Sequence, residues 1–122
     1  MRSKATPDQT VRVTYDPSRP TPWSFEPETV RMTAAGRIIL MQHPANQGWS
    51  FTGFAVTGKR GTPNPPSDEF TRDAGHSSPT QLTIQDAWTT QGTYCYTVTI
   101  SADGGSLTSP DPQIINEAPP GP

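Results

Sequence analysis

Short stretches of alternating apolar and polar residues recur along this 122-residue chain, and the spacing typical of helices does not. Successive side chains of a strand point to opposite faces of a sheet, so each alternating stretch predicts a half-buried strand. The clearest stretch is residues 92–100, in which four apolar side chains fall on one face: Tyr94, Tyr96, Val98 and Ile100. The same alternation predicts strands at residues 10–15, 30–32, 51–57 and 80–86, and it places Trp23 and Phe25 on one face.

The remaining segments complete a single all-β domain. The nearly continuous apolar run at residues 37–42 predicts a central strand covered on both faces, and Asp103-Gly104-Gly105 predicts a hairpin before a last short strand at 112–116. The 15 prolines favour short strands joined by rigid loops over helices. We therefore expect one Greek-key β-sandwich, antiparallel or mixed, of about seven or eight strands over residues 1–117, followed by a proline-rich tail at 118–122.

The alternating pattern disappears between residues 58 and 79, where prolines and charged residues accumulate. A structureless connection of this length is unusual in a compact domain unless it is functional or mobile, so it is either a binding loop or an inert insertion. Ser67 is a typical helix cap and predicts a helical turn at 67–72. The candidate ligand-binding or partner-binding side chains of this loop are Asp68, Glu69, Arg72 and His76.

The loop residues match no spacing that is typical of a metal site or of a catalytic site, and we interpret them as solvated charges. Asp73, His76 and Ser77 include the residue types of a hydrolase. As neighbours in one loop they lack the rigid scaffold that holds a nucleophile beside its base. We therefore expect no enzymatic activity and no metal.

Charge and hydropathy exclude further classes of partner. The formal net charge of −2 provides no basic face for nucleic acid or for an anionic membrane. No run approaches the roughly 20 apolar residues that span a bilayer, and no hydrophobic stretch follows the first residues as in a signal peptide. We expect a soluble protein, either cytoplasmic or secreted or periplasmic after loss of its signal peptide. The single cysteine, Cys95, forms no internal disulfide.

The order of the motifs resembles that of the cupredoxins. From Trp23 onward the chain reads Phe25-x-Pro27-x-x-Val30-x-Met32, then Gly36 and an apolar strand, then Leu82-x-Ile84, then Gly92-x-Tyr94-x-Tyr96-x-Val98. The resemblance covers most of the chain and implies a cupredoxin-like sandwich. An immunoglobulin-like sandwich is the alternative, because Gly92-x-Tyr94 is also similar to the tyrosine corner of that fold.

The cupredoxin resemblance implies a copper site, but the ligands for it are missing. The family holds copper with a cysteine at the position of Val98, two histidines and usually a methionine. No histidine or methionine follows Val98 in this chain. His43 lies close to the position where the family commonly has an asparagine. We therefore expect no copper and no other cofactor.

Trp23, Trp49 and Trp88 each lie beside polar or turn residues. Exposed aromatic side chains on a sandwich stack on sugars or anchor protein partners, whereas buried ones close the ends of the core. Trp49 follows a polar loop and is the best candidate for exposure, together with His43 at the same end. We expect a non-catalytic binding or protein-interaction module with a protein or glycan partner. A carbohydrate-binding module and, less favoured, an electron-transfer copper protein are the alternatives.

Overall fold

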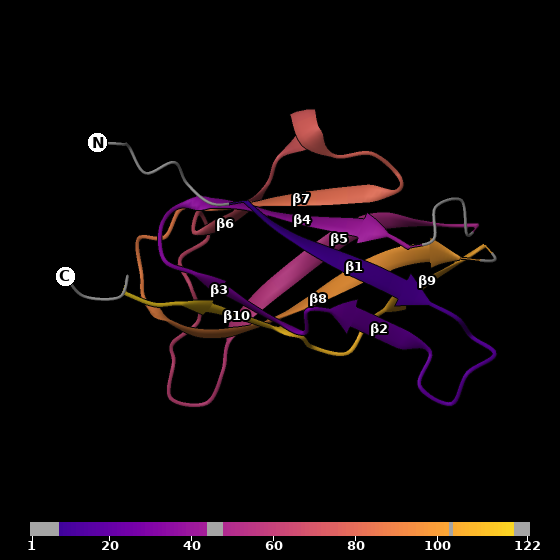
Figure 1. Ribbon diagram of the computed structural model, residues 1–122, viewed down its shortest axis with the longest axis horizontal. Coiled ribbons are helices and arrows are strands. Elements are labelled where there is room, and N and C mark those ends of the chain that lie inside the picture. Colours follow the sequence, from indigo (N-terminus) through magenta and orange to yellow (C-terminus); the bar gives the residue numbers. More distant parts are fainter. Residues whose placement is uncertain (1–7, 44–47, 103, 119–122) are drawn as a thin grey trace.

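The computed structural model describes residues 8–43, 48–102 and 104–118, and these form an all-β sandwich of two packed sheets (Figure 1). The sandwich predicted from the alternating pattern is confirmed, with ten strands where seven or eight are predicted. The strands are β1 (Gln9–Tyr15), β2 (Trp23–Glu26), β3 (Thr29–Met32), β4 (Gly36–Gln42), β5 (Trp49–Gly58), β6 (Phe70–Arg72), β7 (Gln81–Asp86), β8 (Gly92–Ala102), β9 (Gly105–Thr108) and β10 (Gln113–Asn116), with one 3-10 turn, η1 (Ala74–His76).

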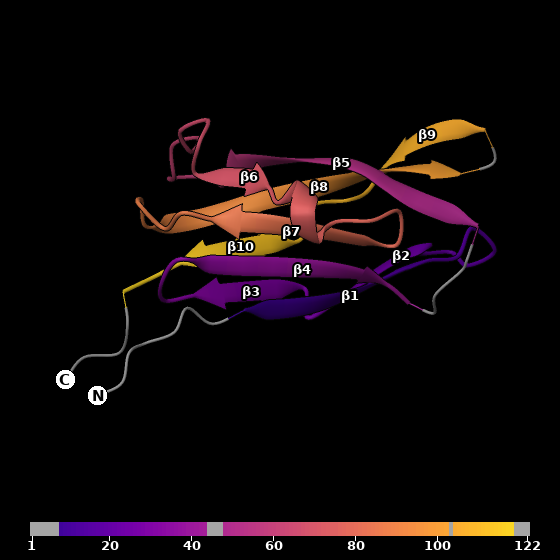
Figure 2. The same cartoon turned by 90° about the horizontal axis from the view of Figure 1, so that it is seen from above.

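Both sheets are mixed. The first has the strand order β2-β1-β4-β7-β6, and the second has the order β3-β10-β8-β5, with β9 paired to β8. β1 runs parallel to β4, and β10 runs parallel to β3, while the other pairs are antiparallel. Figure 2 shows β5 and β6 along one border of the molecule and β1 and β3 along the opposite border, and the edge strands of the two sheets are β2 and β6, and β3 and β5. The sandwich therefore has two open sides.

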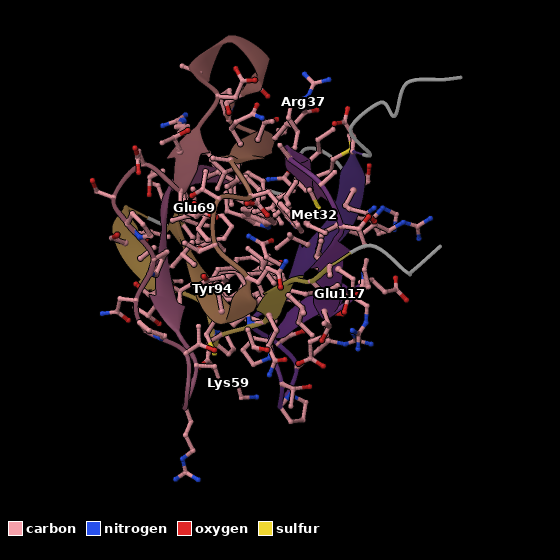
Figure 3. The ribbon with its side chains drawn as sticks, turned by 90° about the vertical axis from the view of Figure 1, so that its left-hand side faces the viewer. Met32, Arg37, Lys59, Glu69, Tyr94 and Glu117 are labelled. Carbon is pink, nitrogen blue, oxygen red and sulfur yellow. The ribbon has the colours of Figure 1, made fainter. Side chains whose placement is uncertain are left out.

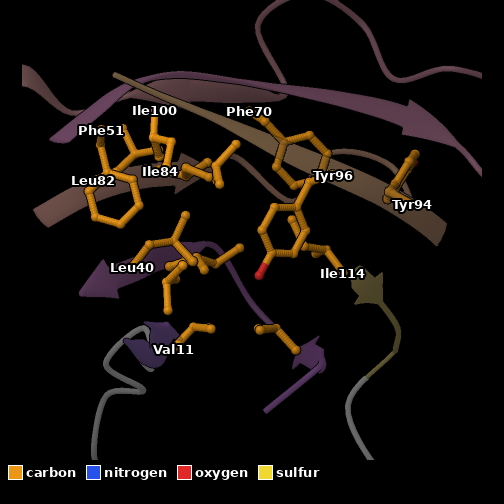
Figure 4. Packing of buried hydrophobic residues seen from close by; sticks show 14 of the residues in the cluster. Val11, Leu40, Phe51, Phe70, Leu82, Ile84, Tyr94, Tyr96, Ile100 and Ile114 are labelled. Carbon is orange, nitrogen blue, oxygen red and sulfur yellow. The ribbon is translucent and has the colours of Figure 1, made fainter. Parts of the chain in front are cut away.

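The core lies between the sheets and follows the predicted alternation (Figure 4). The four residues predicted to share one face of β8 are all buried, at 1% exposure or less: Tyr94, Tyr96, Val98 and Ile100. They pack against alternate residues of β1, β4 and β7, which include Val11, Leu40 and Leu82. Gly104 and Gly105 lie at the predicted reversal, where β9 folds back on β8; Asp103 and the end of the tail, residues 119–122, lie outside the described residues.

The prediction that residues 37–42 are covered on both faces is wrong. Ile38 and Leu40 are buried, but Met41 on the opposite face is 41% exposed. The outward face of β4 is open to solvent at Met41. Apolar residues on that face lengthen the apolar run in the sequence, but they are not part of the core. Among the described residues, no helix is long and apolar enough to cross a membrane.

Residues 58–79 are not structureless: turns hold the part before β6, and pairing with β7 orders the part from Phe70 onward. Of the helical turn expected at 67–72, the first half is a turn at 67–69, where the Glu69 N–H donates to the Pro66 carbonyl at 3.0 Å, and the second half is β6, which pairs with β7 over Phe70 to Arg72. After β6, the Asp73 N–H donates to the Thr83 carbonyl at 2.9 Å, and the Thr83 N–H donates to Ser77 Oγ at 3.0 Å. The edge of β7 offers unpaired backbone groups, and satisfying them outweighs the weak local preference for a helix.

Candidate functional site

Trp49 is 5% exposed, so its predicted exposure is wrong. It is the first residue of β5, and its ring packs edge-on against the ring of Phe51, with centroids 5.1 Å apart. Residues 49 and 51 share a strand face, and that face is the core face. His43, just after β4, is exposed. The two residues therefore do not form a common binding surface.

The four candidate residues from the 58–79 segment do not form a common site either. Asp68 and Arg72 are exposed, as expected for solvated charges, and the side chain of His76 lies outside the described residues. Glu69 is 0% exposed, which contradicts its interpretation as a surface charge. Figure 3 shows Glu69 and Tyr94 inside one end of the sandwich, while Lys59 and Glu117 lie at its outside.

Glu69 is held by hydrogen bonds from the connection between β7 and β8. Its Oε2 accepts from the backbone N–H groups of Thr89 at 2.9 Å and Thr90 at 3.0 Å, and both threonine hydroxyls also donate to the carboxylate. Burial by itself raises the pKa of Glu69, but these hydrogen bonds together outweigh it and lower the pKa. Glu69 is therefore a buried anion that fixes the turn before β6.

Asp86 and Asn116 complete this buried polar cluster. Asn116 Nδ2 donates to Asp86 Oδ1 at 3.0 Å, and it lies 3.4 Å from Glu69 Oε2. Among the described residues, Asp86 Oδ2 and Asn116 Oδ1 are buried and have no hydrogen-bond partner. Burial raises the pKa of Asp86 to about 6, against hydrogen bonds from Asn116 and the Trp88 N–H that lower it.

The buried polar cluster does not form an active site. Glu69, Asp86 and Asn116 are each 1% exposed or less, so a substrate cannot reach their carboxyl and amide groups. The cluster instead joins three elements: the turn before β6, the end of β7 and the end of β10. Trp88 flanks the cluster: its backbone N–H donates to Asp86 Oδ1 at 2.9 Å, and its Nε1 donates to the Met32 carbonyl at 2.8 Å.

One open side of the sandwich contains a hollow of about 260 Å³, which we call the aromatic hollow. It lies between edge strand β2 and the segment that leads into β10. The rings of Trp23 and Phe25 are stacked, with centroids 6.1 Å apart and planes at 10°. The shared face predicted for these two residues is therefore confirmed. The other lining residues used below are Glu28, Pro110, Asp111 and Pro112.

The opposite open side contains a second hollow of about 230 Å³, the β5 notch, which is lined chiefly by Phe54, Val56, Pro65, Pro66 and Phe70. The pairing of β5 with β8 is irregular between Phe51 and Gly53. This irregularity shifts the alternation by one residue, so Phe54 and Val56 follow Phe51 to the inner side of the strand. They are only half-buried there, because the sandwich is open at this border.

The backbone edge of β5 is free beside the notch. The Lys59 N–H donates to the Thr93 carbonyl of β8 at 2.9 Å, whereas the Gly58 N–H donates to Asn64 Oδ1, away from β8. Because backbone groups alternate in direction along a strand, those of Phe54 and Val56 also point away from β8. Within the described part of the chain, no other backbone or side-chain group pairs with them.

No model of a known protein family matches the chain, and a search of curated proteins finds no match either. Within residues 8–43, 48–102 and 104–118, no group of three or more His, Cys, Asp or Glu side chains is arranged to hold a metal ion. The candidate sites therefore rest on the two hollows, whose aromatic and apolar residues are visible in the sequence as alternation in the strands 23–26 and 51–57. Glu28, Asp111 and the prolines carry no such signal.

Proposed function

We propose that this chain is a non-catalytic protein-interaction module whose β5 edge captures an extended peptide from a partner. The observation that carries the proposal is the unpaired backbone of Phe54 and Val56 directly beside the apolar β5 notch. A peptide strand added to this edge pairs its own backbone with β5 and inserts one side chain into the notch. The lining contains no charged residue, so the inserted side chain is apolar.

The boundaries of the free edge favour a single peptide strand over a second copy of this domain. At one end, the Phe51 N–H already donates to the Pro79 carbonyl at 2.9 Å. At the other end, the loop that carries Asn64 caps the Gly58 N–H. The open stretch from Phe54 to Val56 is about 10 Å long. A long edge strand of another domain would need backbone groups beyond this stretch that are already paired, whereas a short peptide can pair with the open stretch alone.

The test uses an acetylated and amidated Thr-Val-Thr-Val-Thr peptide and a control peptide with N-methyl groups on alternate residues. We expect the first peptide to shift the amide NMR signals of Phe54 and Val56 and to slow their hydrogen exchange. The N-methylated peptide keeps the side chains, loses the backbone donors and should bind at least about tenfold more weakly. Equal binding of both peptides, or no shift up to about 1 mM, would overturn the proposal.

We also propose that the fold is cupredoxin-like. Two observations support this assignment over an immunoglobulin-like sandwich. Parallel pairs occur in both sheets, whereas the immunoglobulin sandwich consists of two antiparallel sheets. The strand that carries Gly92-x-Tyr94-x-Tyr96-x-Val98 lies inside its sheet, between β10 and β5. A solved structure with the same strand order and a bound metal would provide the decisive comparison.

Copper is not part of the proposed function, because the donor set does not fit it. Val98, at the position of the family's cysteine, is a fully buried hydrophobic residue. Cys95 is half-buried on the other face of β8, three residues away. A blue-copper centre needs a thiolate and two imidazoles around one ion. Titration with a copper salt should therefore remain colourless, and an intense visible thiolate band would contradict this assignment.

A carbohydrate-binding module is the second candidate function. It is favoured by the aromatic hollow, where Trp23 is half-exposed beside Phe25. Stacked aromatic rings at a surface are suited to the apolar faces of sugar rings. Binding on a glycan array, together with quenching of tryptophan fluorescence that is lost in Trp23→Phe, would support this candidate over the peptide-binding module.

A further inference from the structure

The aromatic hollow combines aromatic rings with negative charge. Tyr15 packs against Trp23 with ring centroids 4.8 Å apart, and Trp23 stacks on Phe25 in turn. The ring of Tyr96 packs edge-on against the ring of Phe25, with centroids 6.0 Å apart. This row of contacts fixes the rings at the border of the sandwich. Pro110 and Pro112 form the facing wall and have little freedom to move.

Two carboxylates line the same hollow, and neither is neutralised. Glu28 and Asp111 are exposed, and among the described residues neither side chain forms an ion pair or a hydrogen bond. The two ion pairs of the described chain, Arg31 with Glu117 and Arg37 with Asp8, use other carboxylates. No lysine or arginine lines the hollow. The hollow is therefore negative and has no cation of its own.

The Glu28 backbone is held in place beside the hollow. The Gln113 N–H donates to the Glu28 carbonyl at 2.9 Å, and the Tyr96 N–H donates to the Pro112 carbonyl at 2.9 Å. These bonds tie both walls of the hollow to strands β10 and β8. A ligand that enters the hollow meets a site whose backbone is already ordered, which lowers the entropy that binding costs.

We propose that the aromatic hollow binds an arginine or lysine side chain of a partner polypeptide. The faces of Trp23 and Phe25 attract a cation through the ring quadrupole, and Glu28 and Asp111 attract it by their charge. A sugar is less well matched, since its neutral hydroxyls do not compensate the negative charges of the two carboxylates that line the hollow. This site is separate from the β5 notch, so either site can exist without the other.

The test compares a Gly-Arg-Gly-Arg-Gly peptide with the same peptide in which citrulline replaces arginine. Citrulline keeps the shape of the side chain and removes its charge. We expect the arginine peptide to shift the indole N–H NMR signal of Trp23 and to bind at least about tenfold more tightly than the citrulline peptide. Equal binding of the two peptides, or no shift of the Trp23 signal, would show that the hollow does not recognise a cation.

Three variants separate the local site from the overall charge of the protein. Asp111→Asn and Glu28→Gln should each weaken the binding of the arginine peptide about threefold to tenfold. Asp68→Asn removes the same charge from an exposed turn beside the β5 notch and should leave binding unchanged. The proposal fails if Asp68→Asn has the same effect as Asp111→Asn. It also fails if cellotetraose shifts the Trp23 signal at lower concentration than the arginine peptide does.

The two sites are tested independently by these peptides. The Thr-Val-Thr-Val-Thr peptide carries no charge and should leave the Trp23 signal unshifted, while the arginine peptide should leave the Phe54 and Val56 amides unshifted. Failure at one site with success at the other removes only the corresponding proposal. Because Glu28 and Asp111 are exposed, their substitution should not alter the thermal unfolding midpoint, which serves as the control for folding.

Discussion

The two open sides of this sandwich resemble each other in construction and differ in what they leave unpaired. At the aromatic hollow the nearby backbone is occupied, as the bonds of Glu28 and Pro112 to the neighbouring strands show, and the side chains remain free. At the β5 notch the side chains are apolar and the backbone of Phe54 and Val56 remains free. Binding at the first side therefore depends on charge, and binding at the second depends on backbone pairing.

The buried polar cluster joins chain segments that lead to both sides. Glu69 directly precedes Phe70, which lines the β5 notch. Asn116 ends β10, the strand that begins just after Pro112 of the aromatic hollow. Damage to the cluster should disturb both sides together, whereas a change at one border should leave the other unchanged. This contrast sets the order of the following predictions.

The largest effect is expected from Glu69→Ala. The substitution removes the buried carboxylate that accepts from the part-buried N–H groups of Thr89 and Thr90 and from Asn116 Nδ2, so we expect the free energy of unfolding to fall by about 3 to 5 kcal/mol. Urea unfolding measures the change. Asp68→Ala, one residue earlier and exposed, is the control and should cost at most about 0.5 kcal/mol. Similar costs for the two variants would show that the cluster does not hold the fold.

Proline substitutions at neighbouring positions test the direction of the β5 backbone. Thr57→Pro removes an N–H that points toward β8, and we expect it to lower the free energy of unfolding by about 3 kcal/mol. Val56→Pro removes an N–H that points to the free edge, and we expect it to lower the free energy of unfolding by only about 1 kcal/mol. The same variant should no longer bind the Thr-Val-Thr-Val-Thr peptide. If the two variants unfold at the same urea concentration, the edge of β5 is not free.

Asp86→Asn should stabilise the protein at neutral and alkaline pH. The folded-state pKa of about 6 lies above the ordinary value of 3.8, so the stabilisation linked to this group is complete below about pH 3.8 and is lost as the pH rises through 6. Asparagine has nearly the same shape as aspartate and does not titrate. We expect a gain of about 1.5 kcal/mol at pH 8, half of what the full shift implies, because polar neighbours screen the charge.

The gain from Asp86→Asn should shrink toward zero as the pH is lowered to about 4, where Asp86 itself becomes neutral. Glu69 titrates in the opposite sense in both proteins, since its lowered pKa stabilises the fold at higher pH. Subtracting the wild-type curve from the variant curve removes the part of that contribution that does not depend on the charge of Asp86. A pH-independent difference between the two unfolding curves would contradict the assignment of the buried acid to Asp86.

The smallest effect is expected from salt, and it distinguishes the two open sides most directly. Raising sodium chloride from about 0.05 to 0.5 M should weaken the arginine peptide at the aromatic hollow about fivefold, because the exposed carboxylates are screened. The uncharged peptide at the β5 notch should change by less than about 1.5-fold. Isothermal titration with each peptide measures both. Equal salt dependence would remove the proposed difference between the sides.

The sequence predicted the strands wherever one face is buried and the other is not. Alternation identified β1, β3, β7 and β8 because their inner residues are apolar and their outer residues polar over several positions. β6 was missed, since three residues are too few to show a period. The strand forms because β7 offers it an edge, and that edge is supplied by residues more than ten positions away.

The candidate site was less predictable for the same physical reason. Glu69 reads as a surface charge because its partners lie 20 and 47 positions later in the chain. The polar residues before Trp49 predict that it is exposed. It is buried because β5 begins with this residue on the core face of the strand. The irregularity between Phe51 and Gly53 then brings Phe54 and Val56 to the border. No local pattern in the sequence predicts such a shift in register.

Cys95 gives the chain a practical property. In the register of β8 it lies opposite Thr57 on β5 and opposite Gln113 on β10, so it stands midway between the strands that lead to the two borders. It is half-buried on the outward face of its sheet and is the single thiol of the protein. One fluorophore attached there would report from the same point on ligands arriving at either border, with no engineered cysteine and no change to either hollow.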